Sequence, residues 1–318
     1  MHLCHMEGIK VVFMGTPAFA VASLQAILQH GFEVVGVVTV PDKPAGRGQK
    51  VMTSAVKDFA LEKNLPLLQP IKLKDPVFLE SLASLNADLF VVVAFRMLPK
   101  EVWQMPTLGT INLHGSLLPK YRGAAPIHWA IVNGEKETGV TTFFINEEID
   151  MGNVIEQRSF PIPLDATLGE IHDHMMLIGG DTLCSTISLI AEGKAQPIPQ
   201  SHWIEKGIAP SSAPKLSKEI AQIDWLQTGQ KIHDFVRGMS PFPCAWTLLE
   251  GKQLKIFLGQ ISKEHGEMAP GSYQTDGKNR LSFKTKDAWY DVLTLQFEGK
   301  KKMDVQEFLR GWRPPQRD

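Results

Sequence analysis

The sequence predicts an α/β fold, a Rossmann-like doubly wound parallel sheet, followed by a small OB-like β-barrel domain. Short apolar runs alternate with helix-length segments over residues 9–193, which is the pattern of a parallel sheet with crossover helices. After residue 214 the pattern changes to short β-type segments separated by turn residues. At 318 residues the chain is also long for one hydrophobic core, so two domains are expected.

The first segments read as a βαβ unit. Ile9–Phe13 is a continuous apolar run, as expected for a strand buried on both faces. A helix is predicted from about Pro17 to Gly31, and Phe32–Val40 is the second strand. The turn between the first strand and the helix, GTPAF, has one glycine where a dinucleotide-binding turn needs three. We therefore expect no nicotinamide cofactor.

Further strands and helices complete the predicted sheet. Asp88–Ala94 is the clearest buried strand, and the next strands are Gly109–Leu113 and Gly139–Ile145. A long amphipathic helix is expected at Thr167–Glu192. Shorter helices are expected at Ser54–Lys63, Asp75–Leu85, Pro99–Met105 and Pro126–Asn133, with a short strand at Leu65–Gln69. On such sheets ligands bind beyond the carboxyl ends of the strands.

The predicted N-terminal catalytic domain spans residues 1–193 and the C-terminal β-barrel domain spans residues 215–318. Residues 194–214 are rich in Pro, Ser, Gln and Ala and are predicted to be a linker. In the C-terminal domain one helix, Thr228–Met239, precedes the short strands. The strands are expected at Ala245–Leu249, Leu254–Leu258, Leu281–Lys284 and Trp289–Leu295.

Charge and composition narrow the class of protein. Residues 209–318 hold 17 Lys/Arg and 13 Asp/Glu, a net charge of about +4, whereas residues 1–208 carry about −5. This asymmetry is a weak indication of a polyanionic partner. No apolar run approaches the roughly 18 residues that span a bilayer, and three widely spaced cysteines fit a reducing compartment. We expect a cytoplasmic monomer with no membrane partner.

The segment Thr110–Ile127, TINLHGSLLPKYRGAAPI, carries the candidate catalytic residues. Asn112 and His114 are two apart on a strand, so they face the same side while Leu113 faces the core. An amide beside an imidazole suits chemistry on a carbonyl group. Asp150, in the turn INEEIDMGN, is the third candidate. The alternatives are a hydrogen-bonded core histidine, a turn-forming asparagine and an ordinary turn aspartate.

Two basic segments have similar open interpretations. Residues 41–50, PDKPAGRGQK, lack an apolar anchor and are predicted to be a mobile surface loop. The loop is either a solvated connection or a basic finger that orders on a phosphate backbone, with Arg47 at its tip. Lys300–Lys302 is likewise either solvated surface or part of a phosphate-binding track.

Taken together, these segments resemble the methionyl-tRNA formyltransferase family. The motifs GTPAFA, PDKPAGRGQK, INLHGSLLPKYRGAAPI, EIDMGN, KLSKEIAQIDW and FPCAW occur in the family's order and cover nearly the whole chain. The run HGSLLP…RGAAPI is specific for formyltransferases that use 10-formyltetrahydrofolate. The basic loop and the C-terminal domain narrow the resemblance to the tRNA enzyme. Amino-sugar formyltransferases share HGSLLP but generally lack the basic loop, and they remain the nearest alternative.

The resemblance implies roles for individual residues. Asn112, His114 and Asp150 match the catalytic trio. Residues that match folate-binding segments are Ser116, Leu117, Leu118 and Pro119, with Phe95, Arg96 and Met97 in the exit loop. Residues assigned to tRNA binding are Arg47, Lys43, Lys50, Lys300, Lys301 and Lys302. The exit loop AFRMLP is one residue shorter than the AYGLILP pattern expected in many members, which affects the expected contacts to the pterin ring.

The implied reaction moves a formyl group from 10-formyltetrahydrofolate, the co-substrate, to the α-amino group of initiator methionyl-tRNA, without a metal. Asn112 would stabilise the oxyanion, and His114 would donate to it or relay the amine proton. Asp150 would orient His114 and favour its charged form. The glycines missing from the first turn argue against the alternative of a nicotinamide-dependent oxidoreductase. A non-enzymatic RNA-binding module would leave the trio without a role.

Overall fold

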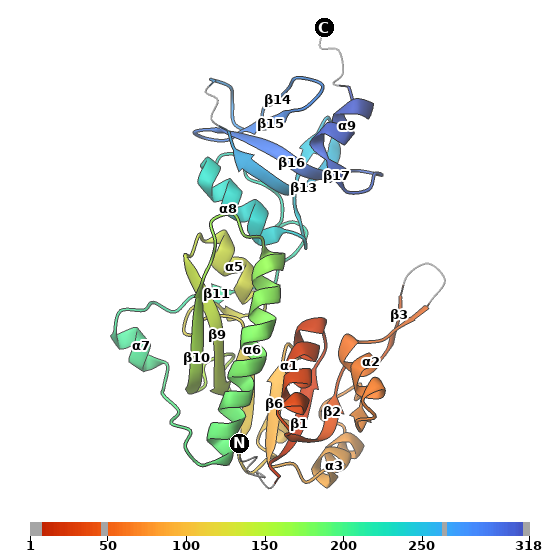
Figure 1. Cartoon of the computed structure of the whole chain (residues 1–318), viewed down its shortest axis with the longest axis vertical. Helices are drawn as coiled ribbons and strands as arrows, with labels where there is room; N and C mark the ends of the chain where they lie inside the picture. Colours follow the sequence, from red (N-terminus) through yellow and green to blue (C-terminus); the bar gives the residue numbers. More distant parts are fainter. Residues whose placement is uncertain (1–7, 46–49, 263–265, 314–318) are drawn as a thin grey trace. The chain divides into compact units, whose positions relative to one another are not determined.

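The computed structural model describes residues 8–45, 50–262 and 266–313 (Figure 1). Contacts divide these residues into two compact units. The first unit comprises Met1–Gly123, Gly139–Phe160 and His172–Ser212, and the second comprises Ala124–Thr138, Pro161–Ile171 and Ala213–Asp318. Short pieces of the N-terminal half therefore pack with the C-terminal half. The sequence-based domain boundaries remain a prediction.

The first unit is built on a seven-stranded sheet with the order β10-β9-β7-β6-β1-β2-β5. Its strands are β1 (Lys10–Gly15), β2 (Glu33–Val38), β5 (Leu67–Leu68), β6 (Leu89–Val93), β7 (Thr110–His114), β9 (Glu137–Phe144) and β10 (Val154–Pro161). The pairs β1–β2, β1–β6, β2–β5 and β6–β7 are parallel. The Rossmann-like fold class is thus confirmed.

One feature of the sheet differs from the all-parallel expectation. β9 pairs with β7 in the antiparallel direction, with Asn112 opposite Phe143 and His114 opposite Thr141. An apolar run predicts a buried strand but carries no information on its direction, so the sequence pattern could not show this reversal. β10, which pairs with β9 at the edge of the sheet, was also not predicted.

Helices cover the sheet and are set by local signals. They are α1 (Ala18–Gln29), α2 (Ala55–Glu62), α3 (Pro76–Ser84), α4 (Lys100–Trp103) and α6 (Leu168–Ala191). Ser54 caps α2 by accepting from the Lys57 amide, and Asp75 caps α3 by accepting from the Val77 amide. Apolar side chains of α3 and α4, such as Leu82 and Val102, pack in one cluster with buried strand residues such as Phe90 of β6.

The long helix α6 lies close to the sheet and to α1 (Figure 1). A Cβ added at Gly179 would stand 3.0 Å from Leu113 Cδ2, and one added at Gly180 would stand 3.0 Å from Ala26 Cβ. The two glycines therefore permit the close approach. Among the described helices, α6 is the one long and apolar enough to cross a membrane, but half of that window is buried in the protein. A buried core helix passes the same test.

The second unit contains an antiparallel sheet with the order β12-β13-β16-β15-β14, and β17 pairs with β16. Its strands are β12 (Ala245–Leu249), β13 (Lys252–Ile261), β14 (Tyr273–Thr275), β15 (Leu281–Lys284), β16 (Trp289–Phe297) and β17 (Met303–Asp304). This curled sheet is consistent with the predicted OB-like domain. Its helices are α5 (Pro126–Val132), α8 (Gly229–Met239) and α9 (Val305–Gly311). In the core, the Trp225 ring stacks on Phe283 at 4.8 Å.

Two segments expected to be irregular contain ordered backbone. The ends of the predicted basic loop pair as a hairpin of β3 (Lys43–Ala45) and β4 (Lys50–Met52), which corrects the expectation of a loop throughout. Backbone pairing needs no apolar anchor, which is why composition did not reveal it. The predicted linker carries α7 (Ser201–Glu205), and β11 (Ser212–Ala213) pairs with β8 (Arg122–Gly123).

Candidate active site

The end of β7 places His114 in the interior of the first unit. The imidazole is buried, with 6% exposed, and lies at 81° to the Phe143 ring on β9, with 6.5 Å between the ring centres. Its Nε2 lies 2.8 Å from the carbonyl oxygen of Tyr121. A carbonyl can only accept, so Nε2 carries the proton and donates. In the neutral ring the other nitrogen, Nδ1, is therefore the one free to take up a proton.

Asp150 lies on the Nδ1 side of this ring. One carboxylate oxygen, Oδ2, is 3.7 Å from His114 Nδ1 and accepts a hydrogen bond of 2.8 Å from the Gly123 amide. The backbone of Asp150 is left-handed, with φ +54°, a conformation that Asp tolerates better than most residues. The carboxylate is thus fixed by the backbone near the imidazole, at an ion-pair distance and not at hydrogen-bond distance.

Asn112 precedes His114 by two residues and faces the same side of β7. Leu113 between them is 3% exposed and points to the core, toward α6. Asn112 is partly exposed, and its amide has no hydrogen-bond partner within the described residues. An amide without an internal partner retains two donors for a ligand. The structure therefore brings His114 and Asp150 together and leaves Asn112 available beside them.

The predicted folate segment after β7 is held rigidly from within. The Thr141 hydroxyl donates to Ser116 O at 2.6 Å and accepts from Leu118 N at 3.1 Å, while Gln157 donates to Leu118 O at 2.8 Å. Ser116 is fully buried and donates to Lys120 O. The side chains of Leu118 and Pro119 are buried and that of Leu117 is partly exposed. Polar contact with a ligand from this segment would have to come from its backbone.

The exit loop of β6 lies at the same sheet edge, because Val93 pairs with Leu113. The Arg96 guanidinium donates to the carbonyl oxygens of Pro70 and Ile71 and lies 5.5 Å from the Phe95 ring centre. Burial lowers the pKa of Arg96 from its ordinary value, and its buried Nε has no partner within the described part of the chain. Met97 is exposed. Arg96 is partly exposed and supports the loop by donating to these two backbone carbonyl groups.

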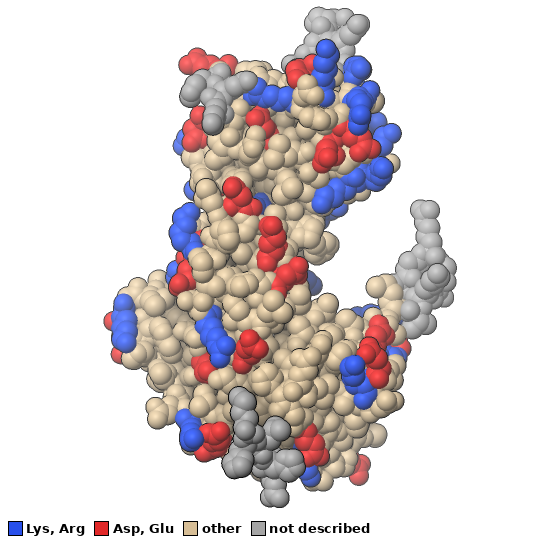
Figure 2. All heavy atoms as spheres, in the orientation of Figure 1, with Lys and Arg blue, Asp and Glu red and all other residues tan. Residues whose placement is uncertain are grey.

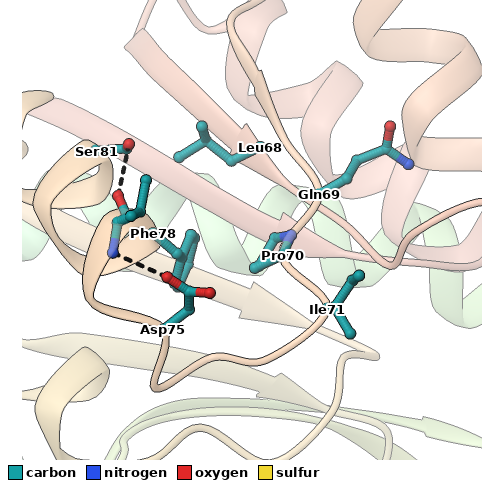
Figure 3. A pocket seen from close by; sticks show the side chains of 8 residues that line it. Leu68, Gln69, Pro70, Ile71, Asp75, Phe78 and Ser81 are labelled. Atoms are coloured by element: carbon teal, nitrogen blue, oxygen red, sulfur yellow. Dashed lines mark hydrogen bonds between the residues drawn. The ribbon is translucent and has the colours of Figure 1, made fainter.

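A shallow hollow of about 260 Å³ opens beside this loop (Figure 3). It is lined by Leu68, Gln69, Pro70, Ile71, Asp75, Val77, Phe78 and Ser81. The Asp75 carboxylate accepts from Val77 N, and the Ser81 hydroxyl donates to Val77 O, as the dashed lines show. Gln69 donates to Val40 O and Asp42. The polar side chains are therefore engaged within the protein, and none of the predicted site residues lines this hollow.

Sequence reasoning missed the residues that hold the Asp150 turn. Arg122 donates to Gln200 Oε1 from Nε at 3.0 Å and from Nη2 at 2.6 Å, and Gln200 donates to the carbonyl oxygens of Asp150 and Gly152. Burial lowers the pKa of Arg122 from its ordinary value. The negative charges of Asp150 and Glu148 partly offset this by raising the same pKa. The motif KYRGAAPI contained Arg122, but nothing in the sequence linked it to Gln200.

The predicted tRNA-binding residues fall into two groups. Arg47 lies outside the described residues, Lys50 is placed only by its backbone in β4, and Lys43 is exposed at the start of β3. Lys300, Lys301 and Lys302 are all exposed before β17. Lys302 Nζ lies 4.6 Å from the Phe257 ring centre on β13. Figure 2 shows Lys and Arg side chains along the edge of the C-terminal unit near α9 and β17, with some acidic residues among them.

No group of three His, Cys, Asp or Glu residues suited to a metal ion occurs within residues 8–45, 50–262 and 266–313. His172 and His174 instead pack against the Phe19 and Phe160 rings.

Comparison with known proteins assigns both halves of the chain. Residues 9–187 match the family model for formyl transferase, and residues 215–313 match that for the formyl transferase C-terminal domain. A curated protein from Bacteroides fragilis, named methionyl-tRNA formyltransferase, is 50% identical over 312 residues, covering 96% of each chain. The similarity therefore extends over both units.

Solved structures share the fold at lower identity. HypX from Aquifex aeolicus in complex with tetrahydrofolic acid matches with a TM-score of 0.64 and 20% identity, covering 95% of this chain and 47% of that one. The N-formyltransferase from Helicobacter canadensis, in complex with folinic acid and dTDP-3-aminofucose, matches with a TM-score of 0.65 and 21% identity. It covers 93% of this chain and 100% of that one. At these identities the likeness establishes the fold alone.

Proposed function

The chain belongs to the formyl transferase family, and within it to the methionyl-tRNA formyltransferases. From this premise we propose that it transfers a formyl group from 10-formyltetrahydrofolate to the α-amino group of initiator methionyl-tRNA. The observation that carries the proposal is the identity of 50% to a protein of that name over almost the whole chain. The proximity of His114 to Asp150 beside the unpartnered amide of Asn112 supplies suitable chemistry.

The proposed reaction is an acyl transfer through a tetrahedral intermediate. The neutral α-amine attacks the formyl carbon, the carbonyl oxygen becomes an oxyanion, and the bond from that carbon to N10 then breaks. The amine loses one proton and N10 gains one, so no proton is consumed overall. Asn112 would donate its amide N–H to the oxyanion, and removal of such a donor typically slows catalysis by about 10²–10³.

His114 would act through Nδ1. Because Nε2–H is committed to the Tyr121 carbonyl, Nδ1 is the nitrogen that can bind and release a proton near the reacting groups. The Asp150 carboxylate, 3.7 Å away, would orient the ring and place a negative charge on its Nδ1 side. The protonated ring would donate to the oxyanion or deliver the proton to N10, and such acid–base assistance is typically worth about 10²–10⁴ in rate.

We propose that the folate lies against the exit loop and the segment after β7. The two segments meet at one sheet edge, and Ser116, Leu118 and Pro119 are buried, so backbone groups and Leu117 are the available contacts. The exit loop, supported by Arg96, would contact the pterin through its own backbone. Tetrahydrofolic acid in the HypX structure supports a folate in this fold.

We propose that the RNA contacts the basic hairpin and the Lys300–Lys302 cluster. All three lysines are exposed, and phosphate contacts need exposed cations. The ring of Phe257, beside Lys302, adds an aromatic surface on the same strand that carries Lys255.

A monomer would suffice, since the proposed catalytic residues all lie in one unit. Methionyl-tRNA as substrate would place the protein in the cytoplasm.

A direct assay tests the activity. The purified protein is incubated with 10-formyltetrahydrofolate and either methionyl-tRNA or a nucleotide-linked amino sugar, and each product is measured. We expect formylation of methionyl-tRNA, and uncharged tRNA with free methionine serves as the control. Formylation of the amino sugar alone would establish the alternative function and overturn the proposal.

A further inference from the structure

The buried side-chain amide of Gln200 joins the Asp150 turn to Arg122 of β8. Gln200 is 4% exposed, and its carboxamide makes four hydrogen bonds. Oε1 accepts from Arg122 Nε at 3.0 Å and Nη2 at 2.6 Å, and Nε2 donates to Asp150 O at 2.8 Å and Gly152 O at 3.0 Å. A primary amide has two acceptor sites and two donors, so all of its capacity is used.

The orientation of this amide is fixed by its partners. The guanidinium of Arg122 can only donate, and the carbonyl groups of Asp150 and Gly152 can only accept. Rotating the amide by 180° would set donors against donors and acceptors against acceptors. No hydroxyl or carboxylate side chain could replace it, because the site needs two acceptor positions on one side and two N–H groups on the other.

The hydrogen bonds on both sides of the Gln200 amide help to fix the position of the Asp150 carboxylate. On one side Gln200 holds the backbone of the turn, where Asp150 is left-handed and Gly152 packs so tightly that an added Cβ would lie 1.6 Å from Phe144 O. On the other side it holds Arg122, next to Gly123, whose amide donates to Asp150 Oδ2. Movement of either side would change the distance from Asp150 to His114.

Gln200 also binds the Arg122 guanidinium, a cation that could otherwise pair with the Asp150 carboxylate in place of His114. Arg122 is partly buried, and the single Gln200 amide bridges it to the Asp150 backbone, so without that amide a direct ion pair between the Arg122 and Asp150 side chains would be favourable. The Gln200 oxygen occupies Nε and Nη2 of Arg122 instead. The negative charge of Asp150 thus stays directed toward His114 and the Gly123 amide.

The segment that carries Gln200 is anchored on both sides within the same unit. Ile198 and Val154 exchange two backbone hydrogen bonds of 2.8 Å. Downstream, Arg122 N donates to Ser211 O at 2.9 Å, and the Ser211 hydroxyl accepts from Tyr121 N at 2.9 Å. Tyr121 O is in turn the acceptor for His114 Nε2. This strap, residues 198–211, therefore contacts the supports of both His114 and Asp150.

We propose that Gln200 is a positioning residue for formyl transfer: it holds the Asp150 carboxylate in place and keeps Arg122 from pairing with it, without touching either substrate. The role in catalysis rests on the proposed function, whereas the positioning of Asp150 does not. The variant Gln200→Ala removes all four hydrogen bonds. Gln200→Glu retains the acceptors for Arg122 and loses the two donors to the turn.

The test combines kinetics with amide exchange. In Gln200→Ala we expect kcat to fall about 10- to 100-fold, the size of effect that small misplacement of a reacting group can produce, with KM for both substrates within about twofold. The exchange rate of the Gly123 amide, followed by NMR, should rise about tenfold as its Asp150 acceptor becomes mobile. Removing Arg122 as well, in Gln200→Ala/Arg122→Gln, should recover part of kcat.

A matched control removes a partly buried hydrogen bond elsewhere in the unit. Ser185→Ala loses the bond to Glu156, at 2.9 Å, and should leave kcat and Gly123 exchange unchanged. Unchanged Gly123 exchange in folded Gln200→Ala would overturn the proposal, as would kcat within twofold of the wild type. If Gln200→Ala does not fold, Gln200→Glu decides by the same two measurements. A wild-type protein that does not formylate methionyl-tRNA would contradict the proposed function. The exchange measurement would still decide whether Gln200 positions Asp150.

Discussion

At the residue scale, one hydrogen bond decides how the candidate site can work. The Tyr121 carbonyl accepts from His114 Nε2, which leaves Nδ1 as the nitrogen facing Asp150. Tyr121 has φ +61°, and this left-handed backbone sets the direction of its carbonyl group. The left-handed backbone of Asp150 sets the direction of its carboxylate in the same way. The side-chain chemistry is therefore set by local backbone conformation.

The first prediction concerns the charge of Asp150. Asp150→Asn should leave the fold intact, because Asn tolerates the left-handed conformation and can still accept from Gly123 N. It removes the negative charge beside His114, so we expect kcat for formylation to fall by about 10²–10⁴. Steady-state kinetics with a circular dichroism spectrum measure this. Turnover within twofold of the wild type would contradict the carboxylate role.

A second prediction at this scale concerns two buried thiols. Burial raises the pKa of both Cys184 and Cys244 to about 12, so neither forms a thiolate at neutral pH in the folded protein. Unfolded thiols ionise near pH 9, and between about pH 9 and 12 the unfolded state therefore binds fewer protons than the folded state. The free energy of unfolding should fall as pH rises through this window.

Peptide mapping after iodoacetamide treatment and urea unfolding at several pH values check the thiol prediction. At pH 8 we expect slow labelling of Cys184 and Cys244 in the folded protein and rapid labelling in urea. The urea midpoint should be lower at pH 10 than at pH 8. This decrease should be smaller in Cys184→Ala, which lacks one of the two thiols. Rapid native labelling of both thiols would show that they are not shielded as described.

At the element scale, helix α8 depends on a buried ion pair in its own turn. Asp234 and Arg237 are 5% and 3% exposed, and the guanidinium donates to Asp234 Oδ1 from Nε at 2.8 Å and Nη2 at 2.6 Å. Nη1 of Arg237 also donates to Ala166 O, in the segment before α6 that belongs to the same unit. A polar link therefore ties a distant stretch of sequence to α8.

We predict that breaking this pair destabilises the second unit. Arg237→Ala leaves the Asp234 carboxylate buried without its cation, and such a change typically costs about 3–5 kcal/mol in the free energy of unfolding. Thermal or urea unfolding measures the change. Lys231→Ala, at an exposed position of the same helix, is the control and should change stability little. Equal stabilities for the two variants would show that the pair contributes little.

At the scale of the whole molecule, charge is unevenly distributed along the sequence. The C-terminal part of the chain is basic and the N-terminal part acidic, and the exposed Lys300–Lys302 cluster lies on the basic part. Lys301 has one weak ion pair with Glu307 at 3.9 Å, which binding could break at low cost. The cluster is therefore available to phosphates.

We predict that replacing Lys300, Lys301 and Lys302 by Gln weakens tRNA binding and reduces the slope of log K against log salt. The slope should decrease by about one unit for each phosphate group that the variant no longer neutralises. Fluorescence titrations over a range of salt concentrations measure both effects. The control replaces the exposed lysines Lys10, Lys63 and Lys72 of the first unit and changes net charge equally. An unchanged slope in the C-terminal variant would remove the cluster from the interface.

Local sequence patterns predicted most elements because each depends on neighbours in the chain. The buried run around Val91 became β6, the helix at residues 167–192 became α6, and Thr228 caps α8 as a good N-cap residue should. Patterns missed what depends on pairing across the chain, namely the reversed direction of β9, the hairpin at Lys43 and Lys50, and the edge strand β10.

The sequence by itself determined the fold class, the two-part organisation and the strand that presents Asn112 and His114 on one side. A period of two residues follows from backbone geometry alone. Only the tertiary structure decided that Asp150 stands 3.7 Å from His114 and that Gln200 holds it there. Those distances depend on contacts between residues 36 to 50 positions apart, whose formation is governed by the packing of the folded chain and not by local propensity.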